Sequence, residues 1–117
     1  DCSNTELRSA LYYIEVDEFK ELINREGQDA GDLIIQICGE RIASTLRNGD
    51  TVARIGDSKF AVCLTPVLQL DLETCVQMAG RIQAAVEEPI SLGGSTVYTS
   101  CSIGFCVAIT KNNSDKS

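Results

Sequence analysis

The stretch R-N-G-D-T-V-A-R-I-G-D-S-K-F-A-V-C-L, residues 47–64, decides the fold of this chain. It holds two β-prone runs, 51–55 and 59–64, separated by Gly56-Asp57, a dipeptide that can take the positive φ of a two-residue hairpin turn. Ahead of them, Asn48-Gly49 is typical of the end of a helix, because both residues tolerate the left-handed conformation. A hairpin on two buried strands holds its tip rigidly, so the sequence predicts a functional loop there.

Upstream of this stretch, the sequence predicts one strand and two helices. Residues 10–16 form an apolar run typical of a strand inside a covered sheet, with Tyr12-Tyr13 assigned to the core and the sheet face. Residues 18–24 indicate a short helix that Gly27 closes. A long helix is expected over 29–46. Its apolar stripe consists of Ala30, Ile34, Ile37, Cys38, Ile42 and Leu46.

Downstream, Asp71 is expected to N-cap a second long helix that ends before Pro89. The predicted inner face of that helix carries Leu72, Cys75, Val76, Ala79, Ile82, Gln83 and Val86. The closing segment is predicted to be a hairpin around Gly93-Gly94, with strands at 90–92 and from 96 to about 109. The order of elements predicts an α+β fold of the ferredoxin-like split βαβ type (βαββαβ) with an added β-hairpin and the helices on one sheet face.

Composition is that of an ordinary globular domain, since 44% of the 117 residues are hydrophobic and 23% are charged. The net charge of −7 and a pI near 4.4 argue against nucleic acid or an anionic membrane as partner. No apolar run in the sequence reaches the length of a membrane span. The 6 cysteines are scattered and the chain has no histidine, so they lack zinc-site spacing and are interpreted as reduced thiols of a cytoplasmic protein.

Four motifs resemble the GGDEF domain, the diguanylate cyclase module that makes cyclic di-GMP from two molecules of GTP. R-x-x-D followed by G-D-S-K-F, within residues 47–60, is similar to the family's R-x-x-D followed by Gly-Gly-(Asp/Glu)-Glu-Phe. E-V-D-E-F-K at 15–20 resembles D-x-D-x-F-K, G-Q-D-A-G-D at 27–32 resembles G-H-x-x-G-D, and S-I-G stands at 102–104. The resemblance covers roughly residues 11–107 and implies a nucleotide-cyclase fold.

At the hairpin tip, the resemblance implies a degenerate active site without catalytic residues or a metal. Only Gly56 and Phe60 match the family pattern. Asp57 replaces the glycine that lets the backbone approach a triphosphate, and it adds a negative charge beside phosphate. Ser58 replaces an acidic metal ligand, and Lys59 reverses the charge of the glutamate that follows.

Other family positions are partly kept. Glu15 stands where the family has its first magnesium ligand, Ile23 where it has a guanine-reading asparagine, and Asp32 keeps the other expected guanine contact. Arg47 and Asp50 match the site where the family holds a cyclic di-GMP dimer, and their side chains suit phosphate and guanine. A structural interpretation of this pair stays open, because an arginine there complements the helix dipole and an aspartate can begin a turn.

These observations predict a catalytically inactive GGDEF domain that serves as a regulatory and protein-interaction module in cyclic di-GMP signalling. G-D-S-K-F is similar to the sequence in FimX-type proteins, which implies a role in type IV pilus biogenesis and twitching motility. The resemblance further implies one domain trimmed at both ends and followed by an EAL domain. The implied partners are that EAL domain, a second copy of the chain and pilus-regulating proteins.

The sequence leaves two alternative functions open. One is a receptor for cyclic di-GMP or GTP through Arg47 and Asp50, and the other is a residual diguanylate cyclase that uses Glu15. No cofactor is expected beyond cyclic di-GMP as a regulatory ligand.

Overall fold

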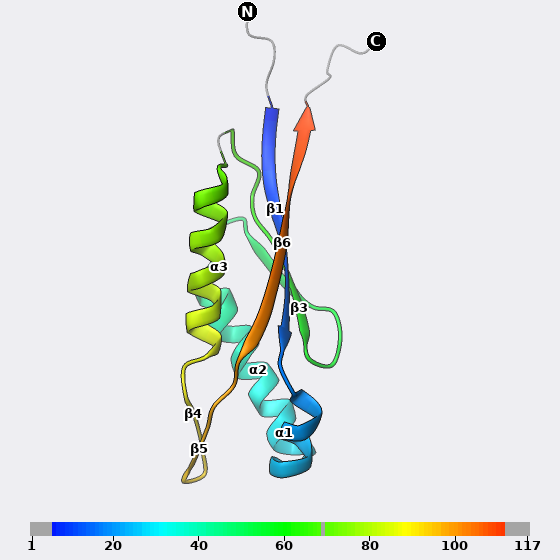
Figure 1. The fold of residues 1–117 in the computed structure, drawn as a ribbon, viewed down its shortest axis with the longest axis vertical. Coiled ribbons are helices and arrows are strands. Elements are labelled where there is room, and N and C mark those ends of the chain that lie inside the picture. Colours follow the sequence, from blue (N-terminus) through cyan, green and yellow to red (C-terminus); the bar gives the residue numbers. More distant parts are fainter. Residues whose placement is uncertain (1–5, 69, 112–117) are drawn as a thin grey trace, which may run out of the picture.

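The computed structural model describes residues 6–68 and 70–111 (Figure 1). The order of its elements begins with β1 (Glu6–Val16), α1 (Phe19–Glu26), α2 (Gln28–Ser44), β2 (Thr51–Arg54) and β3 (Lys59–Cys63). It continues with α3 (Leu72–Val86), β4 (Ile90–Leu92), β5 (Ser95–Val97) and β6 (Cys101–Lys111). In the described residues, no helix is both long and apolar enough to cross a membrane.

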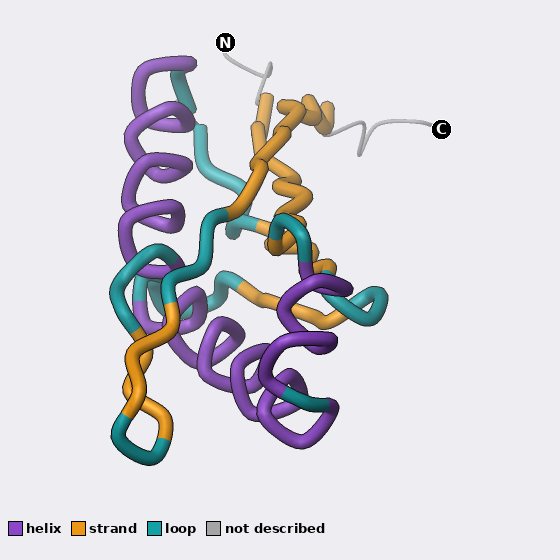
Figure 2. The backbone as a smooth tube through the Cα atoms, turned by 60° about the horizontal axis from the view of Figure 1, so that its bottom comes forward, coloured by secondary structure: helices purple, strands orange, loops and turns teal. Residues whose placement is uncertain are grey.

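The main sheet has the strand order β2-β3-β1-β6, and every neighbouring pair is antiparallel. This is the predicted split βαβ arrangement, because β3 lies between β2 and β1, the two strands that the α1–α2 segment connects. The strands β4 and β5 pair only with each other and form a separate hairpin that projects from the body of the molecule (Figure 2). The predicted fold class is therefore confirmed.

The strand β1 shows why one face of the sheet is covered. Its residues alternate, so that Tyr12, Ile14 and Val16 are buried while Tyr13 is 52% exposed. The Tyr12 hydroxyl donates a hydrogen bond to the backbone carbonyl of Cys75 in α3, at 2.7 Å. The expectation of a strand covered on both faces was wrong in this respect, because the helices of the described chain cover one face only.

Local sequence determines where α3 begins and where α2 ends. Asp71 caps α3 by accepting a hydrogen bond from the backbone N–H of Thr74, as predicted. The helix α2 ends at Ser44 with Thr45 as its C-cap, and Gly49 takes its positive φ of 92° in the turn that follows. The predicted end at residue 46 with an Asn-Gly cap was therefore too late.

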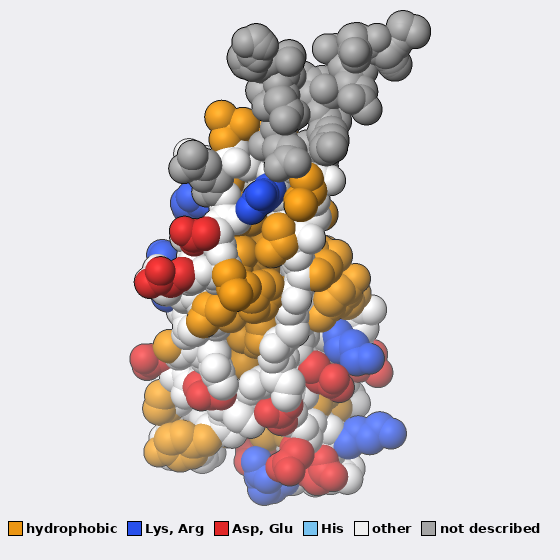
Figure 3. Space-filling view, turned by 45° about the horizontal axis from the view of Figure 1, so that its top comes forward, with side chains coloured by type: hydrophobic (Ala, Val, Ile, Leu, Met, Phe, Trp, Pro, Cys, Tyr) orange, Lys and Arg blue, Asp and Glu red, His pale blue; other side chains and the backbone are white. Residues whose placement is uncertain are grey.

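The inner face of α3 is rotated relative to the predicted one. Its buried residues are Cys75, Met78, Ile82 and Val86. Leu72 and Val76, which were predicted to face inward, are 65% and 53% exposed, and Gln83 is also exposed. Hydrophobic side chains gather in the middle of one face of the molecule (Figure 3). The exposed large hydrophobic residues on α3 and β6 are Leu72, Val76, Val107 and Ile109.

The closing segment differs from the single hairpin that was predicted. Gly93 and Gly94 form the turn with φ values of 51° and 93°, as expected of glycines. The strand then breaks at residues 98–100, where the Thr99 hydroxyl donates a hydrogen bond to the carbonyl of Val86 at 2.9 Å. This anchor redirects the chain, so that β6 begins at Cys101 and pairs with β1 in the main sheet.

The described cysteines form no disulfide: Cys38, Cys75 and Cys101 are buried, and Cys63 and Cys106 are exposed. Burial, reinforced by the carboxylates of Glu87 and Asp17, raises the pKa of the Cys101 thiol to about 12. That thiol is therefore protonated and unreactive near neutral pH. Cys2 lies outside the described residues.

Candidate functional site

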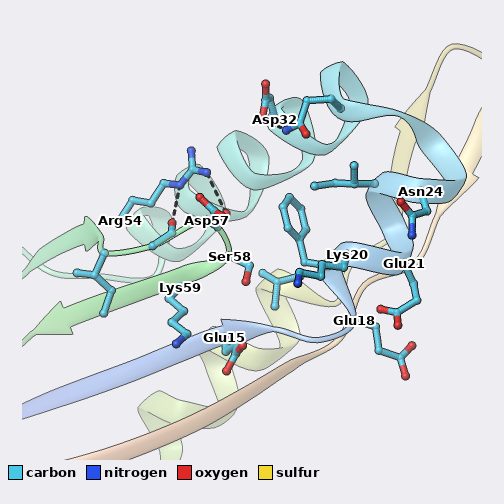
Figure 4. A pocket seen from close by; sticks show the side chains of 16 residues that line it. Glu15, Glu18, Lys20, Glu21, Asn24, Asp32, Arg54, Asp57, Ser58 and Lys59 are labelled. Atoms are coloured by element: carbon cyan, nitrogen blue, oxygen red, sulfur yellow. Dashed lines mark hydrogen bonds between the residues drawn. The ribbon is translucent and has the colours of Figure 1, made fainter.

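An open pocket of about 1000 Å³ lies where α1, the start of α2, the end of β1 and the tip of the β2–β3 hairpin meet (Figure 4). It is lined by the tip residues 54–59, by Glu15 at the end of β1, and by side chains of α1 and α2. The structure therefore brings together residues 15, 23, 32 and 56–59, which the sequence singled out separately.

The hairpin tip is wider than the predicted two-residue turn. Residues 55–58 connect β2 to β3, and neither Gly56 nor Asp57 has a positive φ. The side chain of Arg54 explains this geometry, because its Nε and Nη2 donate hydrogen bonds to the carbonyls of Gly56 and Asp57, each at 2.9 Å. Arg54 therefore holds the tip in shape, a role that the sequence analysis missed.

Phe60 fixes the hairpin to the rest of the fold. Its ring is 4% exposed and lies against Gly39 of α2, where an added Cβ would come within 3.1 Å of the ring. The glycine at that position makes room for the aromatic ring. Phe60 thus belongs to the core, although it stands directly beside the exposed Lys59.

Glu15 and Lys59 face each other across β1 and β3. The backbone N–H of Val16 donates to the carbonyl of Ser58 at 2.9 Å, so the neighbouring Glu15–Lys59 pair is a non-hydrogen-bonded pair, the kind in which side chains come closest. Figure 4 shows both side chains beside each other at the strand ends, away from Asp32. The ammonium group of Lys59 is therefore a neighbour of the Glu15 carboxylate at this edge of the pocket.

Magnesium, the metal that the resembling family binds at this place, does not fit these residues. A hard divalent cation requires several oxygen ligands, and carboxylates are its preferred protein ligands. At the two positions where the family has acidic metal ligands, this chain has the Glu15 carboxylate and the Ser58 hydroxyl, with the positive charge of Lys59 beside them. Within residues 6–68 and 70–111, no group of three or more acidic or cysteine side chains is arranged to hold a metal ion.

The two positions to which the resemblance assigns guanine contacts, residues 23 and 32, make contacts within the chain. Ile23 packs between the helices, because an added Cβ at Gly31 of α2 would lie 2.7 Å from Ile23 Cγ1. Asp32 is exposed and accepts a hydrogen bond from Gln28 at 3.0 Å. Asn24, which follows Ile23 on α1, also lines the pocket.

The pocket is predominantly acidic. Its lining contains the carboxylates Glu15, Glu18, Glu21, Asp32 and Asp57 against the cations Lys20, Arg54 and Lys59. The guanidinium of Arg54 is already engaged with the hairpin tip. A triphosphate in this pocket would therefore meet more negative than positive charge, and like charges about 4 Å apart near a surface repel by roughly 4 kcal/mol.

The R-x-x-D pair lies outside the pocket, at the opposite end of β2 from the tip. The Asp50 carboxylate accepts hydrogen bonds from the backbone N–H of Thr65 at 2.7 Å, the Thr65 hydroxyl at 2.9 Å and the backbone N–H of Arg47 at 3.0 Å. Its side chain is 0% exposed, whereas that of Arg47, with Nε 3.6 Å from Asp50, is 58% exposed. Desolvation alone would raise the pKa of Asp50, but these hydrogen bonds outweigh it and lower the pKa.

Known proteins share this architecture. The family model described as diguanylate cyclase, GGDEF domain, matches residues 1–117. The diguanylate cyclase TpbB of Pseudomonas aeruginosa is 38% identical over 108 residues, which are 92% of this chain and 24% of TpbB. The cyclic di-GMP phosphodiesterase NbdA of the same species is 35% identical over 95 residues, which are 81% of this chain and 12% of NbdA.

Solved structures agree with these matches. The GGDEF domain of TpbB, also called YfiN, from P. aeruginosa superposes with a TM-score of 0.80 at 38% identity, over 86% of this chain and 62% of that one. An EAL/GGDEF domain protein from M. capsulatus gives a TM-score of 0.78 at 33% identity, over 86% of this chain and 64% of that one. The chain thus spans less than two thirds of each of these relatives. On its sequence and its fold, the chain belongs to the GGDEF family of diguanylate cyclase domains.

Proposed function

We propose that this GGDEF domain has no cyclase activity and acts as a regulatory, protein-binding module in a cyclic di-GMP signalling protein. The observation that carries the proposal is the register of β1 and β3, which pairs Lys59 with Glu15 at the position where the family needs acidic metal ligands. Without a bound metal ion, only the cations Lys20, Arg54 and Lys59 stand against five carboxylates in the lining, so a triphosphate would meet an excess of negative charge.

The cyclase assay tests this proposal directly. The purified chain is incubated with GTP and Mg²⁺ or Mn²⁺, and cyclic di-GMP is measured by chromatography, with full-length TpbB as the positive control. Turnover should be roughly 10³-fold or more below that control, because a lost metal ligand and a reversed charge each cost several kcal/mol of transition-state stabilisation. Cyclic di-GMP formation that disappears in Glu15→Ala would contradict the proposal.

A gain-of-binding variant separates the role of the tip from that of the remaining chain. Asp57→Gly, Ser58→Asp and Lys59→Glu together restore the family pattern on the hairpin. Calorimetry should show Mg²⁺-dependent GTP binding in this triple variant and none in the unmodified chain. If neither protein bound GTP, these three side chains would not account for the loss of binding.

The regulatory partners are proposed from the domains that relatives combine with a GGDEF domain. The M. capsulatus protein combines EAL and GGDEF domains, which supports an EAL domain as the neighbour of this one. The role in type IV pilus biogenesis and twitching motility follows from the resemblance to FimX-type proteins alone. We propose a cytoplasmic location on the same ground, consistent with the absence of a membrane-spanning helix among the described residues.

A second candidate function is a cyclic di-GMP receptor that uses Arg47. The guanidinium of Arg47 is largely exposed yet held near Asp50, so it is oriented toward a ligand at little further entropic cost. The buried Asp50 already accepts three hydrogen bonds, so its role is to position Arg47. In this candidate function, Arg47 is the residue that contacts cyclic di-GMP.

This receptor candidate predicts that Arg47→Ala weakens cyclic di-GMP binding about tenfold or more, because a bidentate guanidinium–phosphate contact is lost. Isothermal titration calorimetry measures the effect. Arg25→Ala is the matched control, because Arg25 is similarly exposed at 61% and also stands beside a carboxylate, Glu26. Equal affinity of the Arg47→Ala and Arg25→Ala variants would remove the receptor candidate.

A further inference from the structure

We propose that the exposed face of α3 binds α3 of a second copy of this chain, in an antiparallel arrangement about a twofold axis. The stripe that forms this face consists of Leu72, Val76, Gly80 and Ala84, which are four residues apart and all exposed. The opposite side of the helix carries the core residues. Positions at this spacing form one ridge on a helix surface, the kind that interdigitates when two helices cross at about −50°.

The stripe is self-complementary in size. Leu72 and Val76 are large, while Gly80 and Ala84 are small. When two such helices run antiparallel about an axis between Val76 and Gly80, each Leu72 lies opposite Ala84 of the second copy. Each Val76 then lies opposite Gly80 of the second copy, so protrusions meet recesses on both sides, as an isologous contact requires.

Gly80 has no explanation within a single chain. An added Cβ at this position would meet nothing within 4 Å, and its backbone is ordinary helix without a positive φ. A glycine inside a helix costs stability relative to alanine. Close approach of a second helix accounts for a glycine here, because the missing side chain leaves room for the Val76 side chain of the other copy.

Charge supports the same arrangement. Glu73 and Arg81 lie on the ridge next to the stripe, on either side of Gln77. In the antiparallel pairing, each Glu73 lies about two residues, or about 3 Å along the helix axis, from the level of Arg81 of the second copy, a gap that the long arginine side chain can span. In the part of the chain that the structure describes, neither side chain makes an ion pair or a side-chain hydrogen bond. Such paired charges fix the orientation of a contact more than they strengthen it.

This surface is separate from the nucleotide pocket, because no residue of α3 lines that pocket. Figure 1 shows α3 on one side of the sheet and α1 with the hairpin tip at another end of the molecule. The inference therefore does not rest on the proposed function. A failed dimerisation test leaves the cyclase proposal standing, and the reverse also holds.

Sedimentation equilibrium from about 5 to about 500 μM tests the dimer by mass action. The chain should associate reversibly into dimers, and Gly80→Leu should weaken association about tenfold or more, because leucine fills the recess for Val76 of the second copy. Gln36→Leu on the exposed side of α2 adds the same side chain elsewhere and should have no effect. A chain that stays monomeric throughout, or equal association of Gly80→Leu and the unmodified chain, overturns the proposal.

Charge exchange provides an independent test that does not depend on the bulk of the side chain. Glu73→Arg and Arg81→Glu should each weaken association about tenfold, since each brings two like charges together across the axis. The double variant should recover the affinity of the unmodified chain. Single variants with unchanged affinity would rule out the antiparallel register. Circular dichroism should show that all variants remain folded, because both positions are exposed.

Discussion

Replacing Phe60 with alanine should lower the free energy of unfolding by about 3–5 kcal/mol, the range found for a buried aromatic side chain that leaves a cavity. The ring is almost fully buried and rests on Gly39, so it joins the β2–β3 hairpin to α2. A single domain is stable by only about 5–15 kcal/mol, and this change removes a large part of that margin. Urea unfolding followed by circular dichroism measures the loss.

Two variants control for this prediction. Tyr13→Ala removes a similar aromatic ring from an exposed position of β1 and should cost about 1 kcal/mol or less. Phe60→Leu keeps most of the apolar volume and should cost about 1–2 kcal/mol. If Phe60→Ala were no more destabilising than Tyr13→Ala, the anchoring role of the ring would be wrong.

The position of Phe60 separates the fold of this domain from its chemistry. The ring faces α2, whereas Asp57 and Lys59 are exposed and Ser58 is half-buried. Side chains at the tip can therefore differ from the family pattern without removing core contacts. Under the proposed function, the chain keeps the fold of a diguanylate cyclase domain while Ser58 and Lys59 replace the acidic side chains of the family at the tip.

Most of the fold could be predicted from the sequence because periodicity and turn residues agree. Asp71 caps α3 and Gly93-Gly94 forms a turn, as expected. The face of α3 could not be predicted, because apolar residues surround more than half of this helix. The sequence alone does not distinguish a core built on Met78 from one built on Leu72 and Val76.

The candidate site was predicted as a set of residues but not as a geometry. Glu15, Ile23 and Asp32, which the motifs singled out one by one, line one pocket with the hairpin tip. The width of the tip depends on hydrogen bonds from Arg54 to backbone carbonyls, which no local propensity encodes. Likewise, the partner of Asp50 is Thr65, which is remote in sequence and close only once β3 is in place.

Replacing Asp50 with alanine should lower the free energy of unfolding by about 2–4 kcal/mol at pH 7. Its buried carboxylate accepts hydrogen bonds from the hydroxyl and the backbone N–H of Thr65 and from the backbone N–H of Arg47. The alanine variant leaves these donors without their acceptor and detaches the loop after α2 from the end of β3. Asp57→Ala, on the exposed hairpin tip, is the matched control and should change stability by about 0.5 kcal/mol or less.

The pH dependence of stability distinguishes the charge of Asp50 from its shape. The folded-state pKa lies below the ordinary value of 3.8, so ionised Asp50 stabilises the fold above that value. This contribution is lost as the pH falls from about 4 through the lower folded-state pKa. Asp50→Asn keeps the shape, so its stability should fall below that of the unmodified chain at pH 7, and the difference should narrow toward pH 2. A difference that stays constant between pH 7 and pH 2 would show that the carboxylate charge contributes nothing.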